Sequence, residues 1–135
     1  MPMGSSSAKY VDHGLLVLRV GIGLCFIIHG LGKFMAGTET LTAVGSAVGN
    51  FGISRGYVAF GIAAAGIEVV GGLFVMAGLL FRWACLALMA MLVVALTMHL
   101  KDHDPFSVYS QALECLILFL SLVIIGPGKF SVDKG

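Results

Sequence analysis

The sequence predicts an all-α, integral membrane four-helix bundle, and two observations support this prediction. Of the 135 residues, 59% are hydrophobic and only 11% are charged, whereas about a quarter of the residues are charged in an ordinary globular protein. Four long apolar segments lie between polar or glycine-rich breaks, near 13–35, 57–80, 82–100 and 106–126. Each has close to the roughly 20 residues that a helix needs to cross about 30 Å of hydrocarbon.

The first segment is predicted to be a retained transmembrane helix that follows a flexible, polar, cytoplasmic N-terminus of residues 1–12. A secretory signal is the alternative. Arg19 interrupts the apolar stretch, however, and no small-x-small cleavage site stands in the usual place. Residues 13–126 therefore form the predicted membrane domain, and residues 127–135 form a short C-terminal tail.

The links between the segments predict how the helices are connected. Only "FRW", with Arg82 at the turn, separates the second and third segments, so these helices are expected to form a tight antiparallel hairpin. The glycine-rich link 36–56 contains a weakly amphipathic piece around 41–48, which we expect either to lie along the membrane interface or to dip into the protein. The third link, "KDHDP", is a polar turn, and its Pro105 suits the first turn of the fourth helix.

An even number of spans places both chain ends on one side of the membrane. That side carries Lys9, Arg82, Lys129 and Lys134, and the other side carries Lys33, Arg55 and Lys101. By the positive-inside rule, this margin of one charge predicts that both termini lie in the cytoplasm. The protein is expected in the inner membrane. The net charge is only +1, and the sequence has no basic patch that could neutralise phosphates. No nucleic-acid partner is therefore expected.

Three ionisable residues fall well inside the apolar segments: Arg19, Glu68 and Glu114. A charged side chain near the bilayer centre costs at least about 2.5 kcal/mol, so each needs a partner or a water-lined cavity. Counted along the helices, all three are expected within roughly 10 Å of one another in depth. On the first helix, helical spacing places Arg19, His29 and Lys33 in one sector, which we expect to face the interior of the bundle.

Small residues accompany these charges. Gly71 and Gly72 follow Glu68 by three and four positions, and Gly30 directly follows His29. Such glycines let another helix approach closely, or leave space for a ligand. On the fourth helix, Gln111 precedes Glu114 by three positions and Ser121 follows it by seven, which predicts a polar seam there.

Two interpretations of the buried charges remain open. They can be an interhelical ion-pair network that fixes helix register. Alternatively, they form a functional site, because one arginine facing two acids leaves a carboxylate uncompensated unless His29 is protonated or one acid stays neutral. A neutral carboxyl is what proton-coupled chemistry needs.

Other candidate chemistry has weaker support. The three cysteines form no CxxC pair and no disulfide framework, although Cys25 and Cys115 lie at similar expected depths and could form a redox pair. His29 and His99 could in principle ligate a haem, but His99 is expected to face water or headgroups. No metal site is predicted.

Four stretches in this order resemble the DoxX family of small four-helix membrane proteins: "LRVGIGLCFIIHGLGKF", "FGISRG", "GIEVVGGLFVMAGLLFRWACLALMAML" and "IIGPGKFSVD". The resemblance covers residues 15–133. It implies a membrane subunit linked to quinone redox chemistry, since some relatives are named as subunits of a terminal quinol oxidase or a thiosulfate:quinone oxidoreductase. Other relatives are associated with oxidative-stress complexes that include soluble redox enzymes.

The chain has no flavin fingerprint and no iron–sulfur cysteine pattern, so no intrinsic cofactor is expected and electrons would come from a partner. We therefore predict a DoxX-like subunit that supports quinone-linked redox chemistry or anchors a soluble redox enzyme, and is at most an accessory subunit of an oxidoreductase. The alternative is a non-catalytic scaffold or a small proton-coupled transporter. Glycine-rich faces also allow a homo-oligomer.

Overall fold

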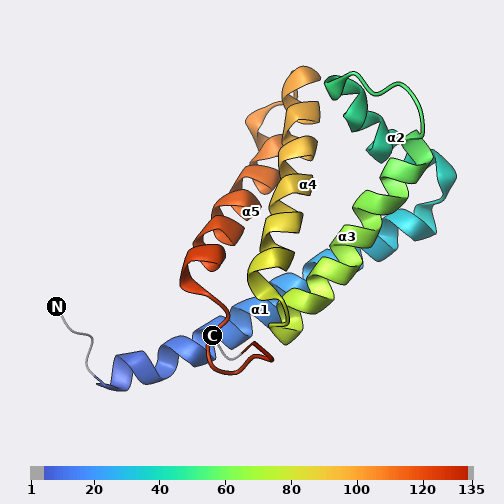
Figure 1. The fold of residues 1–135 in the computed structure, drawn as a ribbon. Helices are drawn as coiled ribbons and strands as arrows, with labels where there is room; N and C mark the ends of the chain where they lie inside the picture. Colours follow the sequence, from blue (N-terminus) through green and yellow to red (C-terminus); the bar gives the residue numbers. More distant parts are fainter. Residues whose placement is uncertain (1–4, 134–135) are drawn as a thin grey trace.

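The computed structural model describes residues 5–133, and this part of the chain is built from helices joined by short links (Figure 1). In chain order these are α1 (Ser5–Ala36), α2 (Thr38–Gly45), the 3₁₀ helix η1 (Ser46–Phe51), α3 (Tyr57–Ala77), α4 (Phe81–Lys101) and α5 (Phe106–Ile125). Four of them, α1, α3, α4 and α5, are long and apolar enough to cross a membrane. The predicted all-α membrane bundle is thereby confirmed.

Two predicted boundaries are wrong. The first helix begins at Ser5, so residues 5–12, expected to be flexible, are helical, while residues 1–4 lie outside the described part. The turn between α3 and α4 lies at 78–80, before the predicted "FRW". Gly78 adopts a left-handed conformation (φ 68°) and ends α3 with a hydrogen bond to the Val75 carbonyl. Hydropathy could not locate this turn because its residues are apolar.

Glycines bring the backbones of α1 and α3 into contact. A Cβ atom at Gly72 would collide with the carbonyl oxygen of Gly23, and one at Gly30 would collide with the carbonyl oxygen of Ala65. At the preceding position of α3, a Cβ atom at Gly71 would meet the Leu88 side chain of α4 at 3.1–3.3 Å. The glycine pair therefore holds α3 between α1 and α4, by the close packing of small residues that membrane helices use.

The bundle is closed at one end and open at the other. Near the α3–α4 turn, Val75, Phe81, Cys85 and Leu122 are almost fully buried. Towards the other end, the α4–α5 pair diverges from the α1–α3 pair (Figure 1). No Cα atoms of α1 and α5 come within 8 Å of each other. The side chains of these two helices do meet: the rings of Phe26 and Phe119 pack edge to face with centroids 5.2 Å apart.

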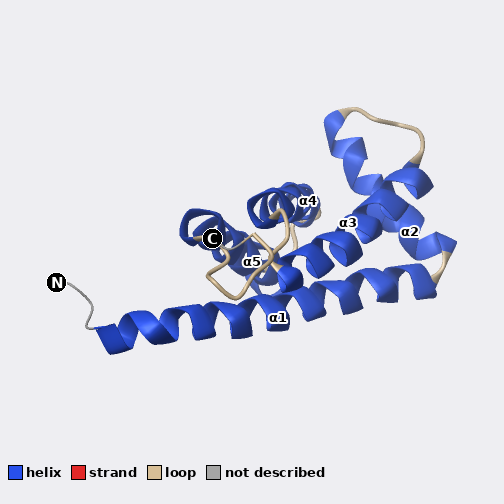
Figure 2. Cartoon of the chain, turned by 60° about the horizontal axis from the view of Figure 1, so that its bottom comes forward, coloured by secondary structure: helices blue, strands red, loops and turns tan. Residues whose placement is uncertain are grey.

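The segment α2–η1 dips into the protein at the open end, which decides between the two positions expected for it. It packs on α3 through two glycines: a Cβ atom at Gly45 would collide with the Tyr57 carbonyl, and one at Gly61 would collide with the Leu41 carbonyl. Leu41 is buried. Figure 2 shows this segment beside the ends of α1 and α3.

The C-terminal tail closes the other end. The two carboxylate oxygens of Asp133 accept hydrogen bonds from the backbone N–H groups of Leu80 (2.9 Å) and Phe81 (2.8 Å) at the start of α4. Asp12 in α1 accepts one from the Lys129 N–H at 3.0 Å. The start of α1 and the tail thus lie at the same end of the bundle, as an even number of spans requires.

Candidate functional site

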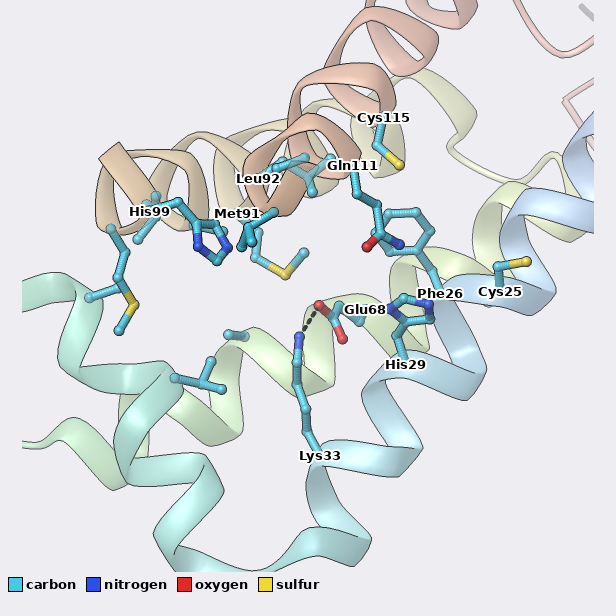
Figure 3. A pocket seen from close by; sticks show the side chains of 18 of the residues that line it. Cys25, Phe26, His29, Lys33, Glu68, Met91, Leu92, His99, Gln111 and Cys115 are labelled. Atoms are coloured by element: carbon cyan, nitrogen blue, oxygen red, sulfur yellow. Dashed lines mark hydrogen bonds and ion pairs between the residues drawn. The ribbon is translucent and has the colours of Figure 1, made fainter. Parts of the chain in front are cut away.

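The splayed helices enclose a cavity of about 520 Å³, within the range of small-molecule sites. All four spans line it, and α2 and η1 complete its wall. Most of the lining is aliphatic or aromatic. The exceptions are Cys25, His29, Lys33, Glu68, His99, Gln111 and Cys115, together with the thioethers of Met91 and Met98. Figure 3 shows that these few polar groups converge on the cavity from α1, α3, α4 and α5.

The most buried of these polar groups is Glu68, which is 4% exposed. The ammonium of Lys33 donates a hydrogen bond to its Oε1 atom and forms an ion pair that joins α1 to α3 (Figure 3). The second carboxylate oxygen, Oε2, is buried and has no hydrogen-bond partner. Buried polar atoms are normally satisfied, so this oxygen is a vacant acceptor, or a vacant donor if protonated, in the wall of the cavity.

His29 and Gln111 face the cavity from opposite sides. The His29 ring stacks on Phe26 with centroids 6.0 Å apart. The Gln111 side chain extends from α5 towards these two rings (Figure 3). Gln111 was not among the predicted site residues, although an amide inside an apolar helix is a signal that could have identified it.

Two cysteines and a histidine also line the cavity. Cys25 and Cys115 approach it from α1 and α5 as free thiols. At the far end (Figure 3), Nδ1 of His99 lies 2.7 Å from Oδ2 of Asp104. His99 lines this end of the cavity, and its side chain is 35% exposed, so the expectation that it faces water or headgroups stays a prediction. Among the described residues, no group of three or more His, Cys, Asp or Glu side chains could hold a metal ion.

The sequence analysis predicted that Arg19 lies close to Glu68 and Glu114. The structure contradicts this prediction. The packing of α1 on α3 places Arg19 beside Gly78, ten residues beyond Glu68 and thus about 15 Å further along α3. Arg19 is 1% exposed and its Nη2 donates to the Phe130 carbonyl of the tail, while Nε and Nη1 have no partner. Lys33 takes the place beside Glu68 that was expected for Arg19.

Glu114 does not join the cavity either. It lies on the exposed surface of α5 and is not part of the cavity lining. A turn of 100° per residue separates it from Gln111 by about 60° around the helix, enough to point the carboxylate outside. The expected cluster of three buried charges is therefore replaced by one ion pair, a separate buried arginine and an exposed acid.

Comparisons with known proteins give a consistent result. The model of the family described as DoxX matches residues 14–100. A protein of Bacillus subtilis (strain 168) named "Putative oxidoreductase CatD" is 35% identical over 98 residues, which are 73% of this chain and 67% of that protein. No solved structure matches the chain.

Proposed function

Because the chain belongs to the DoxX family of membrane proteins, we propose that its cavity binds the headgroup of a quinone and supports redox chemistry that a soluble partner enzyme drives. The observation that supports this most is the buried Oε2 of Glu68, which lacks a partner at the cavity wall. A quinone oxygen can complete that hydrogen bond: a protonated Glu68 donates to a carbonyl, and an ionised Glu68 accepts from a quinol hydroxyl.

The shape and chemistry of the cavity suit this ligand. A quinone headgroup is a flat, mostly apolar ring with two oxygens on opposite sides, and it needs apolar walls with a polar group near each end. Phe26, Met91 and Leu92 supply the apolar surface. Glu68 and His29 lie on the side formed by α1 and α3, and Gln111 faces them from α5 (Figure 3).

The residues of this chain would handle protons rather than electrons. Reduction of a quinone to its quinol takes two electrons, which the soluble redox partner supplies, and two protons. Glu68 can deliver one proton when its carboxyl is protonated at Oε2, and His29 can deliver the other when its ring is an imidazolium. The Lys33 ammonium has three donors, of which one is used by Glu68, so it can also stabilise negative charge that develops on a quinone oxygen.

The direct test is lipid analysis of the protein extracted into native nanodiscs. Mass spectrometry of solvent extracts should find about one quinone per protein for the wild type and a ratio near that of the bulk membrane for Glu68→Gln. Glu114→Gln is the matched control, because it makes the same chemical change at an intramembrane acid outside the cavity. A bulk ratio in the wild type, or equal retention in wild type and Glu68→Gln, contradicts the proposal.

A second candidate function is a non-catalytic scaffold, and the ion pair between Lys33 and Glu68 favours it because it fixes α1 against α3. A transporter that moves protons through Glu68 belongs to the same alternative. A scaffold predicts that Glu68→Gln lowers the protein level or loosens the bundle while the quinone content stays at the bulk ratio throughout.

We propose that the protein lies in the inner membrane, and the charge count supports placing both termini in the cytoplasm. Reporter fusions at the C-terminus test this: a fluorescent protein that folds in the cytoplasm should be bright, and a phosphatase that needs export should be inactive. The reverse pattern would place both termini on the opposite side of the membrane.

A further inference from the structure

The open end of the cavity carries a histidine–aspartate pair that the proposed function does not use. His99, two residues before the end of α4, lines the cavity (Figure 3), and its Nδ1 atom lies 2.7 Å from Oδ2 of Asp104 in the link to α5. The two side chains are 35% and 32% exposed. Asp102 and His103 in the same link are exposed, which places the link at the membrane surface, because charged groups are costly in lipid. The pair therefore connects this surface with the cavity.

The two ring nitrogens of His99 have different surroundings. A carboxylate only accepts hydrogen bonds, so Nδ1 donates to Asp104, which orients the ring and stabilises its charged form. Nε2 forms no hydrogen bond with any residue that the structure describes. This nitrogen is free to take a proton from water and to pass it on, as in a histidine that shuttles protons.

The proposed reaction needs such a shuttle. Reduction of a quinone to its quinol takes two electrons, which the soluble redox partner supplies, and two protons, which Glu68 and His29 supply. Both groups must then be protonated again, and lipid contains no protons to give. We propose that His99 and Asp104 form the proton entrance of the cavity, so that the protons come from the side of the membrane opposite to the chain termini. This inference rests on the proposed quinone site and states where its protons originate.

The closed end offers no comparable route. Val75 and Cys85 are fully buried there. Among the described residues, the buried polar side chains are Arg19 and Glu68, and Arg19 lies at this end. An arginine keeps its proton, and its fixed positive charge repels another. At the open end, by contrast, the cavity of about 520 Å³ has room for several water molecules that can connect His99 with Glu68.

The other titratable groups of the cavity leave this role to His99. They come from three elements and are Cys25, His29 and Lys33 of α1, Glu68 of α3 and Cys115 of α5. The lining residues of α2 and η1 are alanines and a valine, which carry no proton. Lys33 already donates to Glu68. His99 is therefore the lining group that joins an exposed position to a free proton-binding nitrogen.

The test follows quinol formation in nanodiscs that hold one short-chain benzoquinone per protein, after a flash in which a photo-excited ruthenium complex supplies the electrons. His99→Gln should slow this step at least about tenfold, the lower part of the range for proton transfer by a side chain. Added imidazole should restore the rate to within a few-fold of wild type, which it cannot do for a structural defect. His103→Gln makes the same change at an exposed histidine of the link and should have no effect.

A second variant covers the case in which His99→Gln fails to fold. Asp104→Asn lies in the link, keeps an acceptor for the ring and removes the charge, and it should also slow quinol formation; Asp102→Asn is its control. In proteoliposomes with uniformly oriented protein, a pH dye should report that the protons are taken up on the side of the open end.

Three results would overturn this inference and leave the quinone site standing: wild-type rates in both variants, a slow rate that imidazole does not restore, or proton uptake on the side of the chain termini. Loss of quinone from His99→Gln would also overturn it, because the residue would then hold the ligand. A wild type that retains no quinone would contradict the proposed function itself, and the proton entrance with it.

Discussion

Replacing Lys33 with methionine removes the cation from the ion pair in the cavity wall. In the structure, Glu68 Oε1 has the Lys33 ammonium as its partner and Oε2 has none. The variant therefore leaves a carboxyl that is 5% exposed without any partner. Removing one member of a buried pair costs 3–5 kcal/mol. Because the Lys33 side chain is 28% exposed, we expect the lower limit, about 3 kcal/mol.

The thiol of Cys85 provides the assay. It is 0% exposed in the core between the helices, so a thiol reagent reaches it only when the bundle opens. Cys25→Ser and Cys115→Ser remove the other thiols. Where the bundle recloses faster than the reagent reacts, the modification rate measures the open fraction. A loss of 3 kcal/mol then raises the rate roughly 100-fold in nanodiscs. Lys101→Met, at an exposed lysine, is the control and should leave the rate unchanged.

The double variant Lys33→Met, Glu68→Gln tests whether the cost comes from the stranded carboxyl. It removes both charges, so the Cys85 rate should return most of the way to the wild-type rate. If Lys33→Met changes the rate less than about threefold, or if the two substitutions are simply additive, the ion pair does not couple α1 to α3 and this reasoning is refuted.

Three further substitutions test other contacts. Gly72→Ala places a methyl group against the Gly23 carbonyl and should destabilise the bundle by about 2 kcal/mol, whereas Gly66→Ala on the same helix meets nothing within 4 Å and should leave the Cys85 rate near wild type. Asp133→Ala removes both acceptors at the start of α4 and should cost about 1 kcal/mol, seen as faster hydrogen exchange at the Leu80 and Phe81 amides; unchanged exchange would mean that the contact contributes nothing. Arg19→Met frees the Phe130 carbonyl and should speed exchange at the Val132 amide, which bonds to Ala77, while equal protection in both proteins would show that the tail holds without Arg19.

Much of the fold could be predicted because a membrane-spanning helix can be recognised from the length and hydrophobicity of its own segment. The bounds expected for the second, third and fourth spans agree with α3, α4 and α5 to within three residues, since a run of about 20 apolar residues can satisfy its backbone in lipid only as a helix. The α3–α4 turn was misplaced because Gly78 ends α3 through its left-handed φ, and a backbone angle leaves no trace in hydropathy.

The candidate site was predicted less well than the fold. His29, Lys33 and Glu68 do line one cavity, but Arg19 and Glu114 lie elsewhere, and Gln111 and His99 were left out. Depth along each helix can be counted from the sequence, whereas the offset between two helices depends on which surfaces fit. Here Gly23 against Gly72 and Gly30 against Ala65 set that offset, and it brings Lys33 rather than Arg19 to Glu68.

The sequence by itself determined that this protein is an all-α membrane bundle, that it resembles the DoxX family, and that its charges require partners, because hydrophobicity, segment length and the energetic cost of a buried charge are properties of the residues themselves. Only the tertiary structure decided which charges meet, that α5 carries its acid on the outside, and that a cavity of about 520 Å³ opens where the helix pairs diverge. These depend on the fit between residues that are far apart in the chain, and local periodicity contains no information about that fit.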